Sequence, residues 1–219
     1  MTHARWIRFT RLATAVAALG LALPGCAALF MGGAVIGSGL VATDRRTTGT
    51  QIEDESIELK AASRARDLAT LGRINIVSYN RTVLIAGEVP GEPEKAAVER
   101  AVTGVENVRL VVNELAVMPG TTMGTRSSDT LLGARVKATM IDAKDVQAHA
   151  FKVVVERGIV YLMGRVTERE AARGADLARS VSGVQKVVRV FEILTEEQLA
   201  GLSGPQAPAA AAAAASAPK

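Results

Sequence analysis

An internal repeat constrains the fold of this 219-residue chain more than any other feature of its sequence. Residues 73–89 (RINIVSYNRTVLIAGEV) match residues 150–166 (AFKVVVERGIVYLMGRV) at an offset of 77. Gly87 meets Gly164 and Val89 meets Val166, and most other matched positions are Val, Ile or Leu. Because a repeated sequence builds the same unit twice, the chain is expected to contain two copies of one small fold.

Each matched segment predicts a β-hairpin followed by a helix and a third strand. The turns at Asn80-Arg81 and Arg157-Gly158 separate two runs rich in Val and Ile, as expected of hairpins. The later elements are expected as helices over residues 92–103 and 168–182 and strands over residues 107–117 and 186–194. The helical segments are rich in Ala, Glu and Arg, which favour helices.

A helix is also expected before each hairpin. The apolar residues that fall on one helical face are Ile57, Ala61, Ala65 and Leu68 in the first copy and Leu132, Val136 and Met140 in the second. Each copy is therefore predicted to be α-β-β-α-β, with a right-handed parallel crossover after the hairpin. The fold class is α+β, with two helices covering one face of a three-stranded mixed sheet. Each unit is small, at roughly 60–65 residues, so packing between the two is expected to add stability.

The N-terminal segment has the pattern of a secretory signal that ends at the single cysteine, Cys26. Arg5, Arg8 and Arg11 precede an apolar stretch over residues 12–23. This stretch is shorter than the roughly 20 residues needed to span a bilayer, so residues 1–25 are expected to be a signal peptide. The ending Leu-Pro-Gly-Cys resembles the lipobox of bacterial lipoproteins. An ordinary signal peptide with an incidental cysteine is the alternative.

The lipobox resemblance implies that Cys26 is acylated and anchors the chain to a membrane, because two or more acyl chains give stable attachment. Ala27, rather than aspartate, follows the cysteine, which by the same resemblance implies the outer membrane, facing the periplasm. Residues 1–25 carry three arginines and no acid, so their removal lowers the net charge from +4 to +1. That charge, with only 3% aromatic residues, does not favour nucleic-acid binding.

The sequence divides into seven segments by composition. The segments are a signal peptide (1–25), the acylated cysteine with an apolar glycine-rich membrane-proximal segment (26–42), a polar connector (43–56), a first domain (57–118), a linker (119–128), a second domain (129–194) and a disordered Ala/Pro-rich tail (195–219). A flexible leader is the alternative for residues 27–42. The G-x-G-x-x-A pattern at residues 37–42 has no strand before it, which argues against dinucleotide binding.

The repeat resembles the BON domain, present twice. The residues that carry the resemblance are Ile74, Ile76, Gly87, Val89, Gly104, Val105, Val108 and Asn113, then Val153, Val155, Gly164, Val166, Gly183, Val184 and Val187. Residues 42–45, 49–51 and 164–171 also resemble segments of the dual-BON outer-membrane lipoproteins (the DolP/YraP-like family). The resemblance covers roughly residues 23–194. It implies binding to anionic phospholipid and maintenance of the outer-membrane barrier, with links to the division site.

The sequence contains no pattern typical of catalysis. His149 has no cysteine or second histidine near it, and no metalloprotease, P-loop or nucleophile-elbow motif is present. The acidic clusters lie at expected helix starts or in loops, where carboxylates favour the helix dipole. We therefore expect a protein that is not an enzyme, with no catalytic residues, no metal and no cofactor.

The two copies differ on the outer side of their first helices. The first copy has Ser56, Lys60, Ser63 and Arg66 where the second has Leu131, Arg135, Ala138 and Ile141. The second copy is thus expected to present an apolar ridge beside Arg135 and Lys137, as a helix entering an anionic lipid surface would. Net charge agrees, at −2 over residues 44–118 and +3 over residues 128–194. Two alternatives are that the ridge packs against the first domain, or that it has no role.

The leading hypothesis is a non-enzymatic outer-membrane lipoprotein that binds anionic phospholipid through Leu131, Arg135, Lys137, Ala138 and Ile141. Its partners would be the anionic membrane and envelope or division proteins. A periplasmic chaperone or adaptor for envelope proteins is the alternative, since other BON-domain proteins are similar. A spacer that uses the Ala/Pro tail is a third hypothesis.

Overall fold

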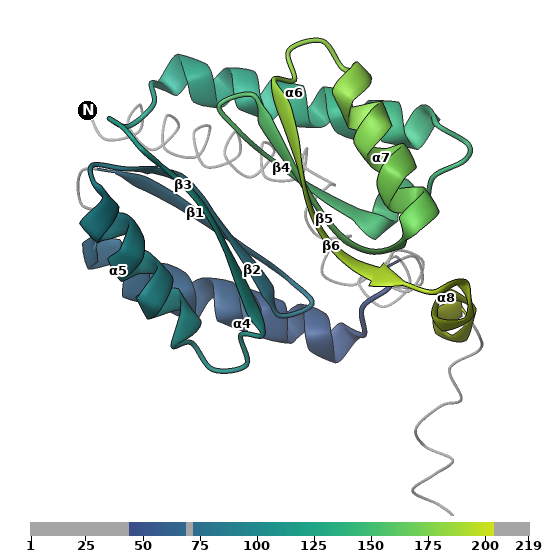
Figure 1. Cartoon of the computed structure of the whole chain (residues 1–219), viewed down its shortest axis with the longest axis horizontal. Coiled ribbons are helices and arrows are strands. Elements are labelled where there is room, and N and C mark those ends of the chain that lie inside the picture. Colours follow the sequence, from purple (N-terminus) through teal and green to yellow (C-terminus); the bar gives the residue numbers. More distant parts are fainter. Residues whose placement is uncertain (1–43, 69–71, 204–219) are drawn as a thin grey trace, which may run out of the picture. The chain divides into compact units, whose positions relative to one another are not determined.

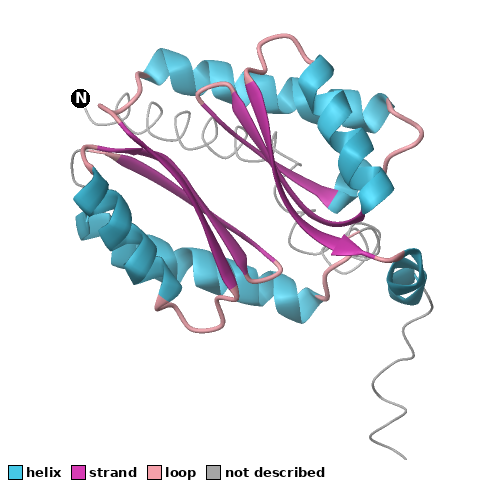
Figure 2. Ribbon diagram, viewed as in Figure 1, coloured by secondary structure: helices cyan, strands magenta, loops and turns pink. Residues whose placement is uncertain are grey.

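The computed structural model describes residues 44–68 and 72–203, which fold as two α-β-β-α-β units. The segments expected as a signal peptide (1–25) and a membrane-proximal segment with Cys26 (26–42) lie outside the described residues, as do residues 204–219. The first unit consists of α4 (Thr48–Ala65), a short 3-10 turn (Arg66–Leu68), β1 (Arg73–Tyr79), β2 (Thr82–Val89), α5 (Glu92–Thr103) and β3 (Leu110–Val117). The second consists of α6 (Met123–Asp142), a 3-10 turn (Ala148–Ala150), β4 (Phe151–Glu156), β5 (Ile159–Thr167), α7 (Glu168–Ser180) and β6 (Lys186–Leu194). Figures 1 and 2 show both units.

Both sheets have the topology predicted from the repeat. The second strand is central in each, in the orders β1-β2-β3 and β4-β5-β6. The hairpin pairs are antiparallel, and the pairs joined through a helix are parallel. The α+β prediction of two three-stranded mixed sheets, each covered by two helices on one face, is therefore confirmed (Figure 2).

The hairpin turns require left-handed backbone, and their residues provide it. Asn80 and Arg81 have φ of 50° and 65°, and Arg157 and Gly158 have 54° and 71°. Two consecutive positive φ values mark the turn that matches the twist of the flanking strands. Asn and Gly tolerate positive φ, which explains why Asn80 occurs in the first turn and Gly158 in the second.

Each unit has its own core between its helices and one face of its sheet. In the first unit Ile57, Ala61 and Ala65 of α4 pack with Val83 and Ile85 of the central strand. In the second, α6 contributes Leu132, Val136 and Met140, which pack with Val160 and Leu162. The apolar helix faces predicted from sequence are therefore the buried faces.

A third core joins the two units through the faces of their sheets that carry no helix. Leu84 and Ala86 of β2 and Tyr161 and Met163 of β5 are buried in it. These residues alternate with those that face the helices, so both central strands are buried on both sides. A strand buried on both faces is apolar almost throughout, as β2 (TVLIAGEV) is. The expected packing between the halves thus occurs between sheets.

Ion pairs cross between the units as well. Arg157 Nη1 lies 2.8 Å from a carboxylate oxygen of Glu88, which is fully buried. Arg73 pairs with Glu156 at 3.1 Å and Arg109 with Glu192 at 2.7 Å. A buried carboxylate requires a partner, so these pairs constrain how the two sheets meet.

Three boundaries differ from those expected. The polar stretch 43–56 is mostly the first part of α4, which begins at Thr48 with Thr47 as its cap. The part of α4 that lies within this stretch buries only Asp54 and no apolar residue, so its sequence resembles that of a polar connector. The linker is shorter than 119–128, because α6 begins at Met123, after the cap Thr122. The segment expected as a disordered tail begins with helix α8 (Glu196–Ser203).

Candidate functional site

Helix α6 presents an uncharged stripe to solvent. Leu131 and Ile141 are 64% and 59% exposed, and Ala134 and Ala138 between them are also exposed. At 100° per residue these four positions fall within about 80° of arc around the helix. They lie opposite Leu132, Val136 and Met140, which hold α6 on its sheet. Residues 131, 134, 138 and 141 are called the α6 stripe below.

Four of the five residues predicted from sequence share this surface. Leu131, Ala138 and Ile141 belong to the α6 stripe, and the exposed Arg135 lies on its flank. None of these four lies in the core that joins the two units, which is formed by strand residues. The exposure argues against the alternative that the ridge packs against the first domain. Its role in binding stays a prediction.

Lys137 does not point toward this surface. Its ammonium donates hydrogen bonds to the main-chain carbonyls of Ala148 and Phe151, the latter at 3.0 Å. Burial lowers the pKa of Lys137, as expected when a cation loses part of its hydration. The predicted role of Lys137 in holding a phosphate therefore finds no support in this geometry, since the side chain instead ties α6 to the start of β4.

Sequence reasoning missed two members of the exposed face. Ala134 belongs to the α6 stripe, and Met123, 71% exposed at the first turn, extends the same side of the helix. The spacing of three and four residues from Leu131 to Ile141 was present in the sequence and identifies Ala134. Met123 falls within the predicted linker 119–128, whereas the structure places it at the start of α6.

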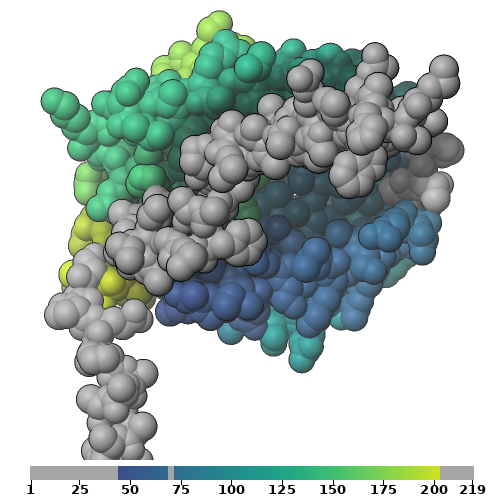
Figure 3. Space-filling view, turned by 180° about the vertical axis from the view of Figure 1, so that it is seen from behind, coloured from purple at the N-terminus to yellow at the C-terminus, as the bar shows by residue number. Residues whose placement is uncertain are grey.

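The first copy is less polar on its outer face than expected. Helix α4 exposes Ile52 by 63% and Leu59 by 74%, although Glu55 and Arg66 lie on the same side. Figure 3 shows α4 (blue) and α6 (teal) on the face seen from behind. Both first helices therefore expose large apolar residues, and the copies differ because charged residues interrupt the exposed side of α4 but not the α6 stripe.

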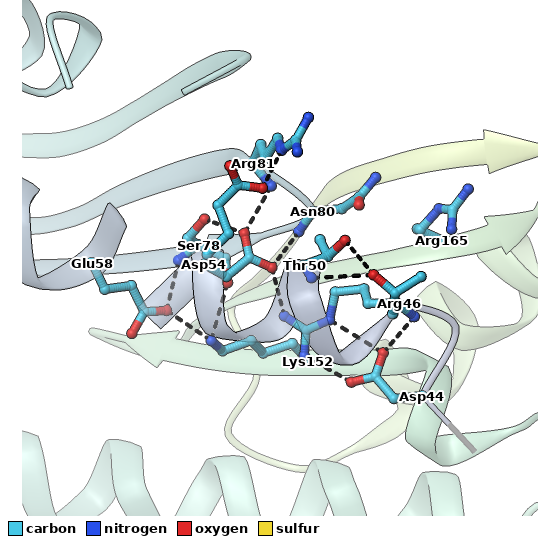
Figure 4. A network of polar contacts seen from close by, with 12 residues as sticks. Asp44, Arg46, Thr50, Asp54, Glu58, Ser78, Asn80, Arg81, Lys152 and Arg165 are labelled. Atoms are coloured by element: carbon cyan, nitrogen blue, oxygen red, sulfur yellow. Dashed lines mark hydrogen bonds and ion pairs between the residues drawn. The ribbon is translucent and has the colours of Figure 1, made fainter. Parts of the chain in front are cut away.

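A buried aspartate on each first helix holds the adjacent hairpin turn. Asp54 accepts hydrogen bonds from the main-chain N–H groups of Asn80 and Arg81, both at 2.8 Å, and from Ser78 Oγ at 2.7 Å (Figure 4). Asp129, 75 residues later, accepts from the N–H groups of the second turn, also at 2.8 Å. The repetition indicates a structural role, because both turns would otherwise leave N–H groups unpaired.

Burial alone would raise the pKa of Asp54, but the hydrogen bonds from Ser78, Arg81 and Arg46 hold it below its ordinary value. The Arg46 guanidinium also lies 4.1 Å from the ring centre of Tyr79. The carboxylate thus stays charged while it serves the turn.

The segment just before α4 is fastened to the second unit. Arg45 forms a two-pronged ion pair with Glu170 of α7, both contacts being 2.7 Å, and each side chain is only 6% exposed. Arg45 also donates to the Arg165 carbonyl, and Arg165 donates back to the Arg45 carbonyl. Residues 44–46 therefore connect both units before the chain enters α4.

Neither a membrane-spanning helix nor a metal-binding cluster occurs in the described part of the chain. No helix within residues 44–68 and 72–203 combines the length and apolar character needed to cross a bilayer. No group of three or more His, Cys, Asp or Glu side chains in the same residues is arranged to hold a metal ion.

Comparisons with known proteins agree with the repeat. The family model of the BON domain matches residues 54–119 and 128–195. The outer membrane lipoprotein DolP of Haemophilus influenzae is 42% identical over 175 residues, covering 78% of this chain and 90% of the relative. The 21 kDa hemolysin of Actinobacillus pleuropneumoniae is 33% identical over 151 residues, covering 68% of this chain and 78% of the relative. The C-terminal domain of the type III secretion protein CdsD of Chlamydia trachomatis is 9% identical with a TM-score of 0.27, over 63% of this chain and 96% of that one, which is too low to carry an argument.

Proposed function

Since this chain belongs to the BON-domain family, as a DolP-like membrane-associated lipoprotein with two BON domains, we propose that its second domain binds anionic phospholipid through α6. One observation carries the proposal, namely that the outward side of α6 is apolar from Leu131 to Ile141 and exposed. An apolar stripe beside a cation is what a helix lying in the membrane interface needs.

The stripe supplies moderate binding energy. Burying an exposed Leu or Ile side chain stabilises by about 1.5–3 kcal/mol, and Arg135 near an anionic surface adds about 1 kcal/mol. Such a sum gives weak binding for a free protein. It becomes effective when an anchor holds the domain near the membrane, because the second contact is then intramolecular.

The anchor in this proposal is an acylated Cys26, which lies outside the described residues. The relative from Haemophilus influenzae is an outer membrane lipoprotein, which supports the outer membrane as the location. The folded units would then face the periplasm. Tethering by Cys26 needs no second lipid site, so the α6 stripe would select anionic regions of the membrane. Through this selection the protein would support outer-membrane integrity, including at the division site.

Vesicle flotation tests the proposal with the chain from residue 26 onward carrying Cys26→Ser. Vesicles of phosphatidylcholine alone are compared with vesicles containing about one third phosphatidylglycerol. The protein with an unaltered α6 stripe should float with the anionic vesicles only. Leu131→Glu should reduce this binding at least tenfold, because a charge replaces the residue that enters the interface.

Leu59→Glu is the matched control, because Leu59 is 74% exposed on the corresponding helix of the first domain. It makes the same change in charge and size, and binding should persist. Equal binding to neutral and anionic vesicles, or equal loss from both glutamate variants, would contradict the proposal.

A chaperone or adaptor for envelope proteins is the second candidate. The observation in its favour is that both first helices expose large apolar residues, Ile52 and Leu59 on α4 as well as the α6 stripe. This candidate expects the same chain to suppress aggregation of an unfolded outer-membrane protein without binding vesicles. Leu59→Glu and Leu131→Glu would then weaken it to a similar degree.

A further inference from the structure

A hollow of about 560 Å³, lined by both polar and apolar residues, lies beside the α6 stripe. It is formed by the first half of α6, the β4–β5 turn and the loop between α7 and β6. The lining residues that matter here are Ser128, Asp129, Arg135, Arg157 and Gln185. Leu132 and Ile159 supply apolar lining. A small polar group therefore has both space and hydrogen-bonding side chains in this hollow.

The first domain has acids at two of the corresponding positions. There Lys60 pairs with Glu106 at 3.5 Å, and Arg81 pairs with Glu53. The repeat offsets of 75 and 79 place Ser128 where the first domain has Glu53 and Gln185 where it has Glu106. The second domain thus keeps a cation, Arg135 for Lys60, and replaces both neighbouring acids with uncharged residues.

Among the described residues, no hydrogen bond or ion pair is made by the Arg135 guanidinium. The other charged side chains of the hollow already have hydrogen-bond partners. Asp129 accepts from the main-chain N–H groups of Arg157 and Gly158, and the Arg157 guanidinium is held by Glu88 and the Gly87 carbonyl. The Arg135 guanidinium is therefore available to bind an anion, while Asp129 and Arg157 already have hydrogen-bond partners within the protein.

The geometry brings further groups next to this cation. A Cβ atom added to Gly183 would lie 3.7 Å from Arg135 Nη2, so the guanidinium lies close to the α7–β6 loop. The Gln185 amide lies over the turn, since a Cβ on Gly158 would be 3.0 Å from Gln185 Nε2. Arg135 and Gln185 therefore reach the same hollow from two elements.

We propose that this hollow binds the phosphate group of a phospholipid headgroup, through the guanidinium of Arg135 and the side-chain amide of Gln185. Ser128 adds no second carboxylate beside Asp129, whose two oxygens already accept the turn N–H groups. Leu131 lies three residues after Ser128 and four before Arg135, so it adjoins both on the helix surface. A lipid can then place its phosphate in the hollow and its acyl region along the α6 stripe. This inference rests on the proposed function, and it identifies the phosphate as the part of the lipid that the hollow binds.

Restoring the acids of the first domain tests the hollow. The variant Ser128→Glu with Gln185→Glu should fold, because both positions are exposed and their counterparts are glutamates. In the flotation assay it should bind phosphatidylglycerol vesicles roughly 25-fold more weakly, about fivefold for each added acid. Arg169→Gln with Arg173→Gln is the control, since it lowers the net charge by the same amount on α7, outside the hollow. It should reduce binding less than about threefold.

A second measurement needs no variant and identifies the source of the phosphate. Amide spectra of the ¹⁵N-labelled chain are recorded with inorganic phosphate, with glycerol 3-phosphate, and with vesicles of stated composition. Shifts at Gly183 and Gln185 with both phosphates and with phosphatidylglycerol vesicles support a headgroup site. Shifts with the soluble phosphates alone would overturn the lipid assignment and indicate a soluble ligand.

The outcomes separate the two proposals. If Leu131→Glu abolishes vesicle binding while the double glutamate variant and the α7 control behave alike, the hollow is overturned and the proposed function stands. If Leu131→Glu has no effect, the proposed function fails. Unchanged Gly183 and Gln185 signals in every titration would also overturn the hollow.

Discussion

Among single residues, two buried aspartates, one in each copy, have the same role of accepting hydrogen bonds from a hairpin turn. Asp54 and Asp129 each accept main-chain N–H groups of a left-handed turn, at 2.8 Å. A helix is thereby fixed to the hairpin that follows it in the chain. Both carboxylates thus pair turn N–H groups that would otherwise lack an acceptor within the protein.

Replacing Asp54 should therefore be costly. Asp54→Ala removes the acceptor for three neutral donors and the partner of Arg46, and we expect a loss of about 3 kcal/mol in the free energy of unfolding. Urea denaturation measures this loss. Asp67→Ala is the control, because Asp67 is exposed, and it should stay within about 0.5 kcal/mol. A similar small effect for both would contradict the assigned role.

The same carboxylate predicts a pH dependence. The pKa of Asp54 is lower in the folded chain than its ordinary value of 3.8, so its stabilisation is present above that value and is lost as the pH falls through the folded pKa. Asp54→Asn should therefore be less stable than the parent at pH 7 and nearly as stable near pH 2. Denaturation midpoints across this range measure the difference, and a constant difference would exclude the carboxylate as its cause.

At the scale of elements, the central strands β2 and β5 are buried on both faces and each contains one glycine at the same position. A Cβ atom on Gly87 would lie 2.1 Å from the Arg73 carbonyl oxygen, and one on Gly164 would lie 2.3 Å from that of Ala150. These distances are shorter than any contact a side-chain carbon makes. The glycines therefore allow the hairpin strands to approach closely at the end away from the turn.

Gly164→Ala should destabilise the second domain by about 2–3 kcal/mol, because the β4 and β5 backbones must separate to admit a methyl group. Gly124→Ala is the matched control, since Gly124 lies in the first turn of α6 and its nearest neighbour would be 3.7 Å away. That change should be neutral or stabilising by up to about 1 kcal/mol. Thermal unfolding of the two variants compares them directly, and equal melting temperatures would disprove the close approach.

In the whole molecule, several sets of contacts join the two BON domains, including ion pairs such as Arg157 with Glu88. Their sheets share a core, and the segment before α4 is fastened to α7 by Arg45 and Glu170. Burial alone would raise the pKa of Glu170, but the hydrogen bond from Arg45 lowers it below its ordinary value. Arg45, at the start of the described chain, thus contacts the second domain, whose α6 carries the proposed lipid surface.

Glu170→Gln should release this segment while keeping the helix cap, because glutamine can replace glutamate in the capping box with Thr167. We expect about 2 kcal/mol less stability and faster tryptic cleavage after Arg45. Glu168→Gln is the control, since Glu168 is exposed and its partner Arg189 is 4.0 Å away. Equal cleavage rates in the two variants would show that the ion pair does not hold the segment.

The candidate site was only partly predictable. Leu131, Arg135, Ala138 and Ile141 were found because helical spacing and comparison between the copies use the sequence alone. Met123 was missed because the start of α6 depends on the cap at Thr122 rather than on apolar spacing. The direction of Lys137 was missed because its acceptors, the carbonyls of Ala148 and Phe151, come from the segment after the helix.

The two α-β-β-α-β units, their hairpin turns and the buried sides of their helices can all be predicted from the amino-acid sequence. These features depend on periodicity and turn chemistry, which act over a few residues, and the repeat displayed them twice. Three features become visible only in the folded structure: the packing of the two sheets on each other, the burial of Asp54 in the polar first part of α4, and the exposure of the α6 stripe. Each of these depends on contacts between residues far apart in the chain, and such contacts leave no local pattern in the sequence.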